Sequence, residues 1–249
     1  MFFQEDHLIS IAGRGTFTVA FQLTAKIGSA DFKVRLEVVL DLTSSAFSDC
    51  MRIYSSCFPQ RQRRPTSSVI AMLRSGKSLL VAGFVREEVA VMCLLFATAD
   101  THFMLCDYLA VSPPYQGQGI GSQFLQQVFC LPQLQKCRHI LIEAEDLAGV
   151  NRSAALRRIS FYRDLGAREA LAIGYDIPPL QGEFWPATPV RILVLSRPGT
   201  FGPADGSQLD GGQLRKGLKS IFCDLYGMDR DDEAVQAMLR RIPPDVILV

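Results

Sequence analysis

The sequence lacks several features that would restrict its class at once. Its 249 residues carry a formal net charge of +1, so it has neither a strong basic field for nucleic acid nor an acidic tail. The longest apolar run, from Val89 to Ala97, has the length of a strand and is well short of the ~20 residues that span a bilayer. Residues 1–6 include two acidic side chains, where a secretory signal requires a basic region. We therefore expect no nucleic-acid partner and no membrane partner.

Histidine is scarce, and no cysteine pattern indicates a metal site or a disulfide framework. The three histidines, residues 7, 102 and 139, form no cluster with cysteine. The seven cysteines are odd in number and scattered, without a Cys-x-x-Cys pair. Cys93 and Cys106 lie inside apolar runs, which favours buried free thiols. Because such thiols persist in a reducing compartment, we expect a cytoplasmic location, and we expect no metal.

The apolar pattern predicts an α/β fold. Residues 17–24 and 32–40 alternate apolar and polar side chains with the two-residue period of half-buried strands. Helices are predicted from Thr43 or Ser44 to Pro59, over 67–74, 119–130, 151–165 and 214–226, and from Asp229 to about Arg241; further strands are predicted over 78–84, 89–98, 102–111, 139–145, 168–175 and, as the last strand, 190–195. Three or more antiparallel strands followed by strand–helix–strand crossovers indicate a sheet of mixed direction.

The most informative stretch joins a buried strand to a helix through three glycines. The strand, residues 104–111, stops at Ser112-Pro113-Pro114, and glycines at 117, 119 and 121 precede a helical apolar spacing. The first N–H groups of a helix lack intrahelical partners and carry the positive end of the helix dipole. Glycine lets the backbone approach a phosphate closely. The stretch therefore predicts a phosphate-bearing ligand at this turn.

Two common phosphate-binding motifs do not fit this stretch. A P-loop requires a lysine after its last glycine, and that lysine is missing. The dinucleotide fingerprint Gly-x-Gly-x-x-Gly differs in spacing from Gly117-x-Gly119-x-Gly121. The loop Gln/Arg-x-x-Gly-x-Gly/Ala does fit, because residues 116–121 match it at every defined position.

With this loop the sequence resembles the GNAT superfamily of acyl-CoA N-acyltransferases. Residues 109–115 are similar to the strand end that leads into the family's pyrophosphate loop. Residues 157–167 resemble a later helix of the family, which carries a tyrosine near its end, here Tyr162, and stops at a glycine, here Gly166. The resemblance implies an α/β fold with a mixed, mostly antiparallel central sheet of about seven strands flanked by helices. An extra N-terminal strand and a C-terminal helical tail are additions of this chain.

The resemblance implies acetyl-CoA as the acyl donor and an amine of a small molecule or a protein as the acceptor. The backbone amides of the strand and the loop are then the cofactor-binding groups, at Leu109, Ala110, Val111, Gln116, Gly117, Gln118, Gly119, Ile120, Gly121 and Ser122. Many members also carry a cofactor-contacting asparagine, at the position that Ala155 occupies in this chain. The nearest asparagine is Asn151, which is the candidate for that contact.

Four residues are candidates for proton transfer. Tyr162 occupies the family's tyrosine position and is expected to protonate the CoA thiolate; the alternative is a core aromatic beside Phe161. Glu143 and Glu145 lie two apart on a predicted strand and share one face, where neighbouring carboxylates favour a base near neutrality. The alternative for this pair is a solvated strand face. Asp107, or a base that acts through water, competes for the role.

We therefore expect three parts: an N-terminal extension over 1–31, a GNAT domain over 32–198, and a linker with a helical cover over 199–249. The expected function is N-acetyl transfer by direct attack in a ternary complex. The alternatives are a non-catalytic acyl-CoA sensor or interaction module of the same fold, and an unrelated α/β protein that binds another nucleotide. A homodimer is compatible with such folds. The basic loop 60–65 is either solvated or a lip that attracts an anionic group of the acceptor.

Overall fold

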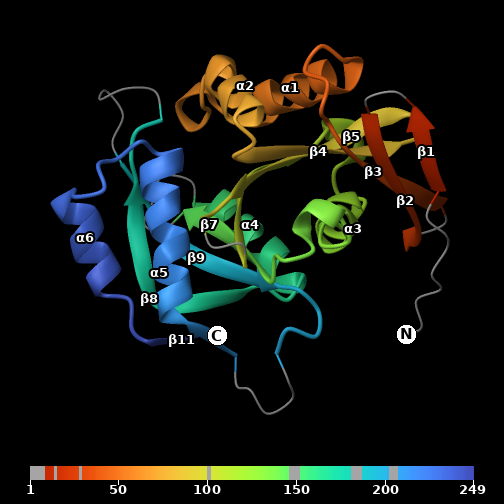
Figure 1. The fold of residues 1–249 in the computed structure, drawn as a ribbon. Helices are drawn as coiled ribbons and strands as arrows, with labels where there is room; N and C mark the ends of the chain where they lie inside the picture. Colours follow the sequence, from red (N-terminus) through yellow and green to blue (C-terminus); the bar gives the residue numbers. More distant parts are fainter. Residues whose placement is uncertain are drawn as a thin grey trace. The chain divides into compact units, whose positions relative to one another are not determined.

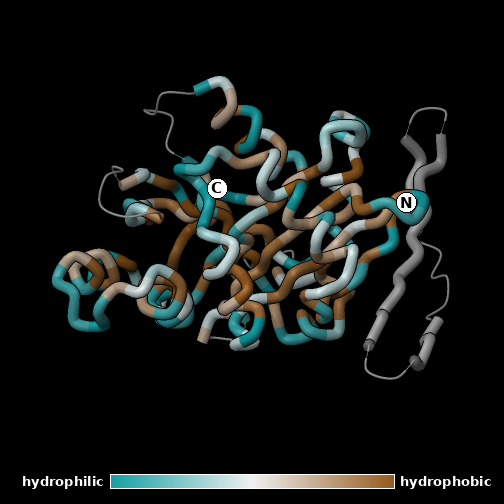
Figure 2. The backbone as a smooth tube through the Cα atoms, turned by 90° about the horizontal axis from the view of Figure 1, so that it is seen from above, coloured by the Kyte–Doolittle hydropathy of each residue, from teal (hydrophilic) through white to brown (hydrophobic). Residues whose placement is uncertain are grey.

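The computed structural model describes residues 9–13, 16–27, 30–99, 102–145, 152–180, 187–201 and 207–249 (Figure 1). The chain forms two compact units. The first contains Met1–Leu95 and Tyr108–Gln135, and the second contains Phe96–Asp107 and Lys136–Val249. The most strongly hydrophobic segments lie in the interior and the hydrophilic ones at the surface (Figure 2).

The first unit is built on a sheet with the strand order β1-β2-β3-β4-β5-β6. The strands are β1 (Ile9–Gly13), β2 (Thr16–Ile27), β3 (Ala30–Val38), β4 (Ser78–Val85), β5 (Glu88–Ala97) and β6 (Phe103–Val111), of which β6 continues into the second unit. The first four are paired antiparallel. The strands predicted over 17–24 and 32–40 are confirmed as β2 and β3. Strand β1 was not predicted, because its five residues end in glycine and are too few for a period to be recognised.

The α-helices of this unit begin and end within about two residues of the positions predicted from the sequence, and short 3-10 turns lie beside them. They are α1 (Ser45–Cys57), the 3-10 turn η1 (Gln60–Gln62), α2 (Thr66–Arg74), η2 (Pro113–Tyr115), α3 (Ile120–Val128) and η3 (Pro132–Leu134). Of the two candidate caps for α1, Ser44 is the N-cap, since its hydroxyl accepts a hydrogen bond from the backbone N–H of Phe47 (3.2 Å). The hydroxyl of Thr43 instead donates to Asp41 (2.6 Å).

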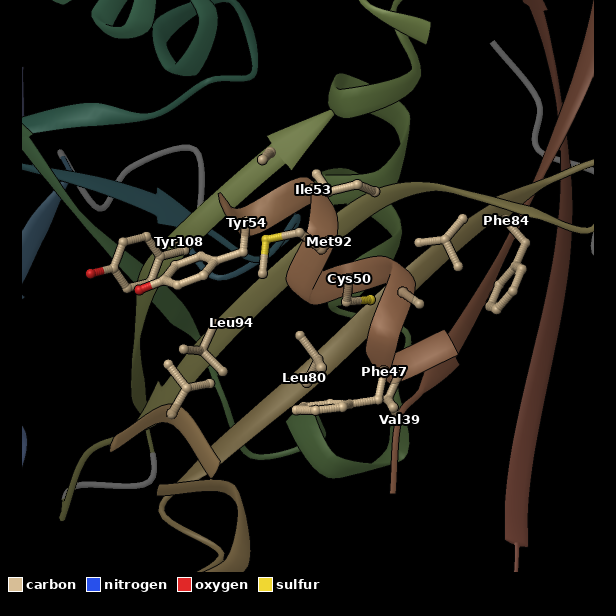
Figure 3. Packing of buried hydrophobic residues seen from close by; sticks show 14 residues of the cluster. Val39, Phe47, Cys50, Ile53, Tyr54, Leu80, Phe84, Met92, Leu94 and Tyr108 are labelled. Carbon is tan, nitrogen blue, oxygen red and sulfur yellow. The ribbon is translucent and has the colours of Figure 1, made fainter. Parts of the chain in front are cut away.

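Helices α1 and α3 cover opposite faces of the sheet in this unit. Leu80, Ala82 and Phe84 of β4 pack with Phe47, Cys50, Ile53 and Tyr54 of α1 in one buried cluster (Figure 3). Residues between them in the strand point to the other face. There Gly83 lies against the ring of Phe124, a fully buried residue of α3. Helix α3 and the loop that precedes it are thus held on the sheet by direct contact with a glycine.

A methyl group at Gly83 is expected to push α3 off this face. An added Cβ would lie 2.7 Å from Phe124 Cδ2 and 3.1 Å from Val91 Cβ. We expect Gly83→Ala to destabilise the fold by about 1–3 kcal/mol, the usual cost of overpacking, measured by urea unfolding. In a Phe124→Leu background, which removes the ring, the same substitution should cost less. An equal cost in both backgrounds would contradict the contact as the cause.

The sheet of the second unit has the order β6-β7-β9-β8. Its further strands are β7 (His139–Glu145), β8 (Arg168–Ile177) and β9 (Thr188–Ser196). Strand β7 is parallel to β6 and antiparallel to β9, and β8 is antiparallel to β9. The β6–β7 register contains three pairs and ends at Leu105 and Leu141, whereas β7 pairs with β9 to its end at Glu145. The two units together confirm the predicted mixed, mostly antiparallel sheet flanked by helices.

The C-terminal tail, residues 207–249, contains the predicted helices and two strands that were not predicted. Its elements are β10 (Gln208–Asp210), α5 (Gly211–Ser220), the π-helix η4 (Ile221–Leu225), α6 (Glu233–Arg240) and β11 (Asp245–Ile247). Strand β9 is therefore not the last strand, since β10 pairs with β11. The end of the chain also joins the sheet, because Val249 and Glu169 of β8 exchange two backbone hydrogen bonds (2.8 and 3.0 Å).

The predicted cap of the last helix is wrong by three residues. The side chain of Asp232 accepts from the backbone N–H of Val235 (3.0 Å) and so begins α6. Asp229 instead accepts from the N–H of Asp231 (3.0 Å) in the preceding turn. Both aspartates can close a local turn in this way, so the residue type alone does not distinguish the cap.

The seven cysteines are free thiols. Cys50, Cys93, Cys106 and Cys137 are buried, as the sequence predicted for thiols in apolar runs, whereas Cys130 is exposed. Burial raises the pKa of Cys50 to about 12 and that of Cys137 to about 11, so these two thiols are unreactive at neutral pH.

Candidate active site

The glycine loop of the first unit begins with a firmly held strand end. The backbone N–H of Ser112 donates to the carbonyl of Ala90 in β5 (2.8 Å). The side-chain amide of Gln116 donates to the carbonyl of Val111 (2.8 Å), and that of Gln118 donates to the carbonyl of Pro114 (2.8 Å). The two glutamine side chains therefore stabilise the segment between the strand and the glycine loop. Their amide nitrogens donate to the backbone, so the groups that can bind a ligand in this loop are backbone N–H groups.

The glycines turn the chain so that the first amides of α3 stay free. Gly117 and Gly119 have positive φ values of 73° and 72°, which other residues adopt at a cost. Gly119 is the N-cap of α3 and provides no side-chain cap. Its carbonyl accepts from Gln123 (3.1 Å), and within the described residues no acceptor occupies the backbone N–H groups of residues 119–122. Four free amides at a helix start are the arrangement that binds an anion.

The strand residues with predicted amide contacts differ in the direction of their side chains. Ala110 is buried in the cluster under α1, whereas Leu109 and Val111 on either side of it are half-buried. The carbonyl of Val111 accepts from Gln116, as described above, and from the Cys57 thiol at the end of α1 (3.7 Å). The end of strand β6 is thus held by the side chains of Gln116 and Cys57, which come from two different segments of the first unit.

Tyr162 lies in the second unit, at the end of α4 (Arg152–Asp164). Gly166 has φ 89° and ends the helix with a Schellman motif, in which the N–H of Ala167 donates to the carbonyl of Tyr162 (2.9 Å) and that of Gly166 donates to Arg163 (2.8 Å). The half-buried ring of Tyr162 contacts Phe161 edge to face, with centroids 5.0 Å apart. Asn151, the candidate asparagine, lies outside the described residues.

The two glutamates of β7 share one face, as the spacing predicts, but they have different partners. Both side chains are half-buried, whereas Ile142 and Ala144 beside them are buried. Glu145 forms an ion pair with Arg158 of α4. Glu143 accepts a hydrogen bond from the phenol of Tyr175 in β8 (2.5 Å) and another from the phenol of Tyr226 (2.6 Å).

The surroundings of Glu143 keep both phenols protonated. Burial, followed by the charge of Glu143, raises the pKa of Tyr175 and that of Tyr226 well above the ordinary value. The charge of Asp107 on β6 contributes to the raised pKa of Tyr226 and therefore lies near the same group. The second unit thus brings Glu143, Asp107 and the two tyrosines together, while Glu145 is paired with Arg158.

Sequence reasoning did not find Tyr175 and Tyr226. They lie 32 and 83 residues from Glu143 along the chain, in a strand and at the end of a helix. No local spacing relates positions so far apart. Locally, each is a tyrosine within a segment predicted to be a strand or a helix. Many buried tyrosines fit that description, so it does not indicate a functional role.

Two features are absent from the described residues, a membrane-spanning helix and a metal-binding cluster. No helix among them is both long and apolar enough to cross a membrane. No group of three or more histidine, cysteine, aspartate or glutamate side chains in this part of the chain could hold a metal ion.

The fold and the loop define a class of protein. A mixed sheet whose strand β6 leads through a glycine turn to free amides at a helix start is the acyl-CoA N-acyltransferase fold. Residues 75–166 match the family model described as an acetyltransferase (GNAT) domain. This segment, which begins after α2 and ends after α4, therefore resembles GNAT acetyltransferases, in agreement with the resemblance in the sequence.

The first of three similar solved structures supports the fold. An acetyltransferase described as a GNAT family member, from Bacteroides thetaiotaomicron, is 18% identical, with a TM-score of 0.62 over 78% of this chain and 99% of its own. A GNAT family acetyltransferase from Elizabethkingia anophelis with acetyl-CoA bound is 14% identical, with a TM-score of 0.47 over 66% and 97%. The ribosomal-protein-S18-alanine N-acetyltransferase from Escherichia coli is 18% identical, with a TM-score of 0.46 over 69% and 97%. No functionally curated protein matches the sequence.

Proposed function

We propose that this protein transfers the acetyl group of acetyl-CoA to a primary amine of a small molecule or a protein, by direct attack in a ternary complex. The observation that carries the proposal is the set of free backbone N–H groups at residues 119–122, within the segment that matches a GNAT acetyltransferase domain. A carboxylate with two phenol donors supplies the candidate for the acid–base work.

The residues of the loop fit a diphosphate. The amides of Gly119, Ile120, Gly121 and Ser122 are free, and the helix dipole places positive charge at the same point. The half-buried Ser122 can add its hydroxyl in the first turn. Gly117 has no atom within 4 Å of the position that a Cβ would take, so the backbone is accessible there. These residues would hold the diphosphate, with the amides near Leu109 and Val111 on the pantetheine arm.

Acetyl-CoA supplies an acetyl group that is activated as a thioester. Glu143, or Asp107 in its place, accepts a proton from the acceptor ammonium, directly or through water. The freed amine forms the C–N bond to the acetyl carbon as the C–S bond breaks, and Tyr162 donates its phenol proton to the leaving thiolate. The ion pair with Arg158 leaves Glu145 less suited to the role of base.

A matched pair of glycines tests the diphosphate site. Gly117 and Gly76 have nearly the same φ (73° and 71°), and neither has an atom within 4 Å of an added Cβ. Replacing either by alanine should therefore cost the same backbone strain, about 1–2 kcal/mol in urea unfolding. Only Gly117→Ala is expected to weaken acetyl-CoA binding, by about tenfold or more in titration calorimetry, because its methyl group lies on the loop that contacts the diphosphate.

Two further results decide the proposal. Acetyl-CoA at sub-millimolar concentration should raise the Tm of the wild-type protein, since a ligand that binds only the folded state stabilises it. Pantetheine, which lacks the diphosphate, should raise it much less. No shift with acetyl-CoA, or equal binding by the Gly117→Ala and Gly76→Ala variants, would place the cofactor elsewhere or exclude it.

A further inference from the structure

The C-terminal tail places one of its side chains against the candidate base. Tyr226 follows the π-helix η4, in which its backbone N–H donates to the carbonyl of Ile221, five residues earlier (3.0 Å). The wider turn ends the helix, and the N–H of Met228 then donates back to the carbonyl of Phe222 (3.0 Å). Single π turns within helices occur frequently at functional sites. Here the turn precedes the residue whose phenol binds Glu143.

Each of the two phenols binds one oxygen of the Glu143 carboxylate. Tyr175 donates to Glu143 Oε1 (2.5 Å), and Tyr226 donates to Oε2 (2.6 Å). The buried ring of Phe222 contacts both tyrosine rings edge to face, with centroid distances of 4.8 and 6.0 Å. Two donors from different elements, with an aromatic ring between them, fix its plane.

The tail is attached to the second unit at several other points. The hydroxyl of Ser220, 6% exposed, accepts from the backbone N–H of Ala99 (3.1 Å) and donates to Asp224 (3.0 Å). A Cβ at Gly217 of α5 would lie 3.6–3.7 Å from Phe103, which shows how closely this helix packs on β6. The position of Tyr226 is therefore determined by an element that is docked on the second unit.

We infer that Tyr226, with Tyr175, is a positioning residue for catalysis, which holds the Glu143 carboxylate in the orientation that accepts the proton of the acceptor amine. The C-terminal tail is then a part of the active site. This inference rests on the proposed acetyl transfer and assigns to the tail a role in it. The groups that face Tyr226 are Asp107 from β6, Glu143 from β7 and Tyr175 from β8, and all of them favour the protonated phenol.

The substitution Tyr226→Phe tests the inference, because it removes one hydroxyl and keeps the ring against Phe222. We expect kcat to fall about ten- to a hundredfold, the loss that a misplacement of a reacting group by about 1 Å can cause, while KM for acetyl-CoA changes less than about twofold. The acid limb of the pH–rate profile should move to higher pH, since the variant lacks one donor to the ionised carboxylate. The rate is followed as free thiol released from acetyl-CoA, with spermidine, Nα-acetyllysine and an alanine-terminated peptide as probes.

Ser220→Ala is the matched control, because it also removes one hydroxyl from the tail but none that contacts Glu143. It should retain kcat and the wild-type pH profile even if its Tm falls. Tyr175→Phe removes the other phenol from a strand outside the tail and should reproduce the effect of Tyr226→Phe, so the test survives if the tail variant does not fold.

Three outcomes would overturn the inference. Wild-type kcat and pH profile in both tyrosine variants would show that Glu143 needs no such support. An equal loss in Ser220→Ala and Tyr226→Phe would reduce the role of Tyr226 to docking of the tail. If the wild-type protein binds acetyl-CoA but releases no thiol with any of the probes, both the proposed function and the positioning role are contradicted. If the wild type releases thiol and the tyrosine variants do so at the same rate, only the positioning role is contradicted.

Discussion

Glu143→Gln is expected to lower kcat by about two to four orders of magnitude, the usual contribution of a positioned general base. Glu145→Gln, the same change two residues along the same face of β7, is expected to leave kcat within about threefold of the wild type. The two carboxylates differ in their surroundings. Glu143 accepts from two phenols and lies, with Asp107, in the cluster around Tyr226. Glu145 is paired with Arg158.

Single-turnover release of thiol from acetyl-CoA in the presence of excess amine measures this difference, because it reports the chemical step and not product release. Titration calorimetry with acetyl-CoA is the control for binding, and we expect the same affinity for the wild type and for both variants. A loss confined to Glu145→Gln would transfer the role of base to that residue. Full activity in both variants would transfer it to Asp107 or to a water molecule.

The sequence predicted the glycine loop well, because the constraints there are local. Proline at 113 and 114 stops a strand wherever it occurs, and glycine at 117 and 119 permits the positive φ that the turn requires. The end of α4 is of the same kind, since Gly166 alone makes the Schellman motif possible. Such residues determine their own backbone, so their positions in the sequence are sufficient.

The partners of the candidate base could not be predicted in this way. The hydrogen bond between Tyr226 and Glu143 joins residues 83 positions apart, and it depends on a π turn that adds one residue to the helix end. The pairing of Val249 with Glu169 likewise depends on where the tail docks. Local periodicity determines which face of an element is apolar, but not which element covers that face.

The surroundings of the basic loop 60–65 in the first unit could not be predicted from its sequence either. Its charge suggested either a solvated segment or a lip for an anionic acceptor group. The phenol of Tyr54 donates to the carbonyl of Arg64 (3.1 Å), and the phenol of Tyr108 accepts from the N–H of Arg64 (3.2 Å) and donates to the carbonyl of Gln62 (3.0 Å). Arg64 itself is only 8% exposed. Two buried tyrosines thus hold the backbone of this loop, so it is not a fully solvated segment.

Acidification from pH 7 to pH 4 is expected to cost the folded protein about 3 kcal/mol at a single residue, His139. This side chain at the start of β7 is 6% exposed, shares a hydrogen bond with Ser196 (2.9 Å) and stacks on Phe103, with centroids 5.2 Å apart. Burial, assisted by the charges of Arg138 and His102, lowers its pKa from 6.5 to about 4. Between these two values the unfolded chain binds a proton that the folded chain does not bind. Stability therefore falls as the pH decreases through this range.

Urea unfolding at a series of pH values measures the effect, with His139→Gln as the comparison. Glutamine can keep a hydrogen bond to Ser196 but does not titrate, so at pH 7 we expect the variant to differ from the wild type only by its altered packing. The decisive quantity is the slope: the free energy of unfolding of the wild type should fall by about 3 kcal/mol more than that of His139→Gln between pH 7 and pH 4. Parallel pH dependences would show that the imidazole is protonated without cost in the folded state. The interior around Phe103 would then have to admit water or a counter-charge, in contrast to the buried, aromatic-lined position that the structure gives to this ring.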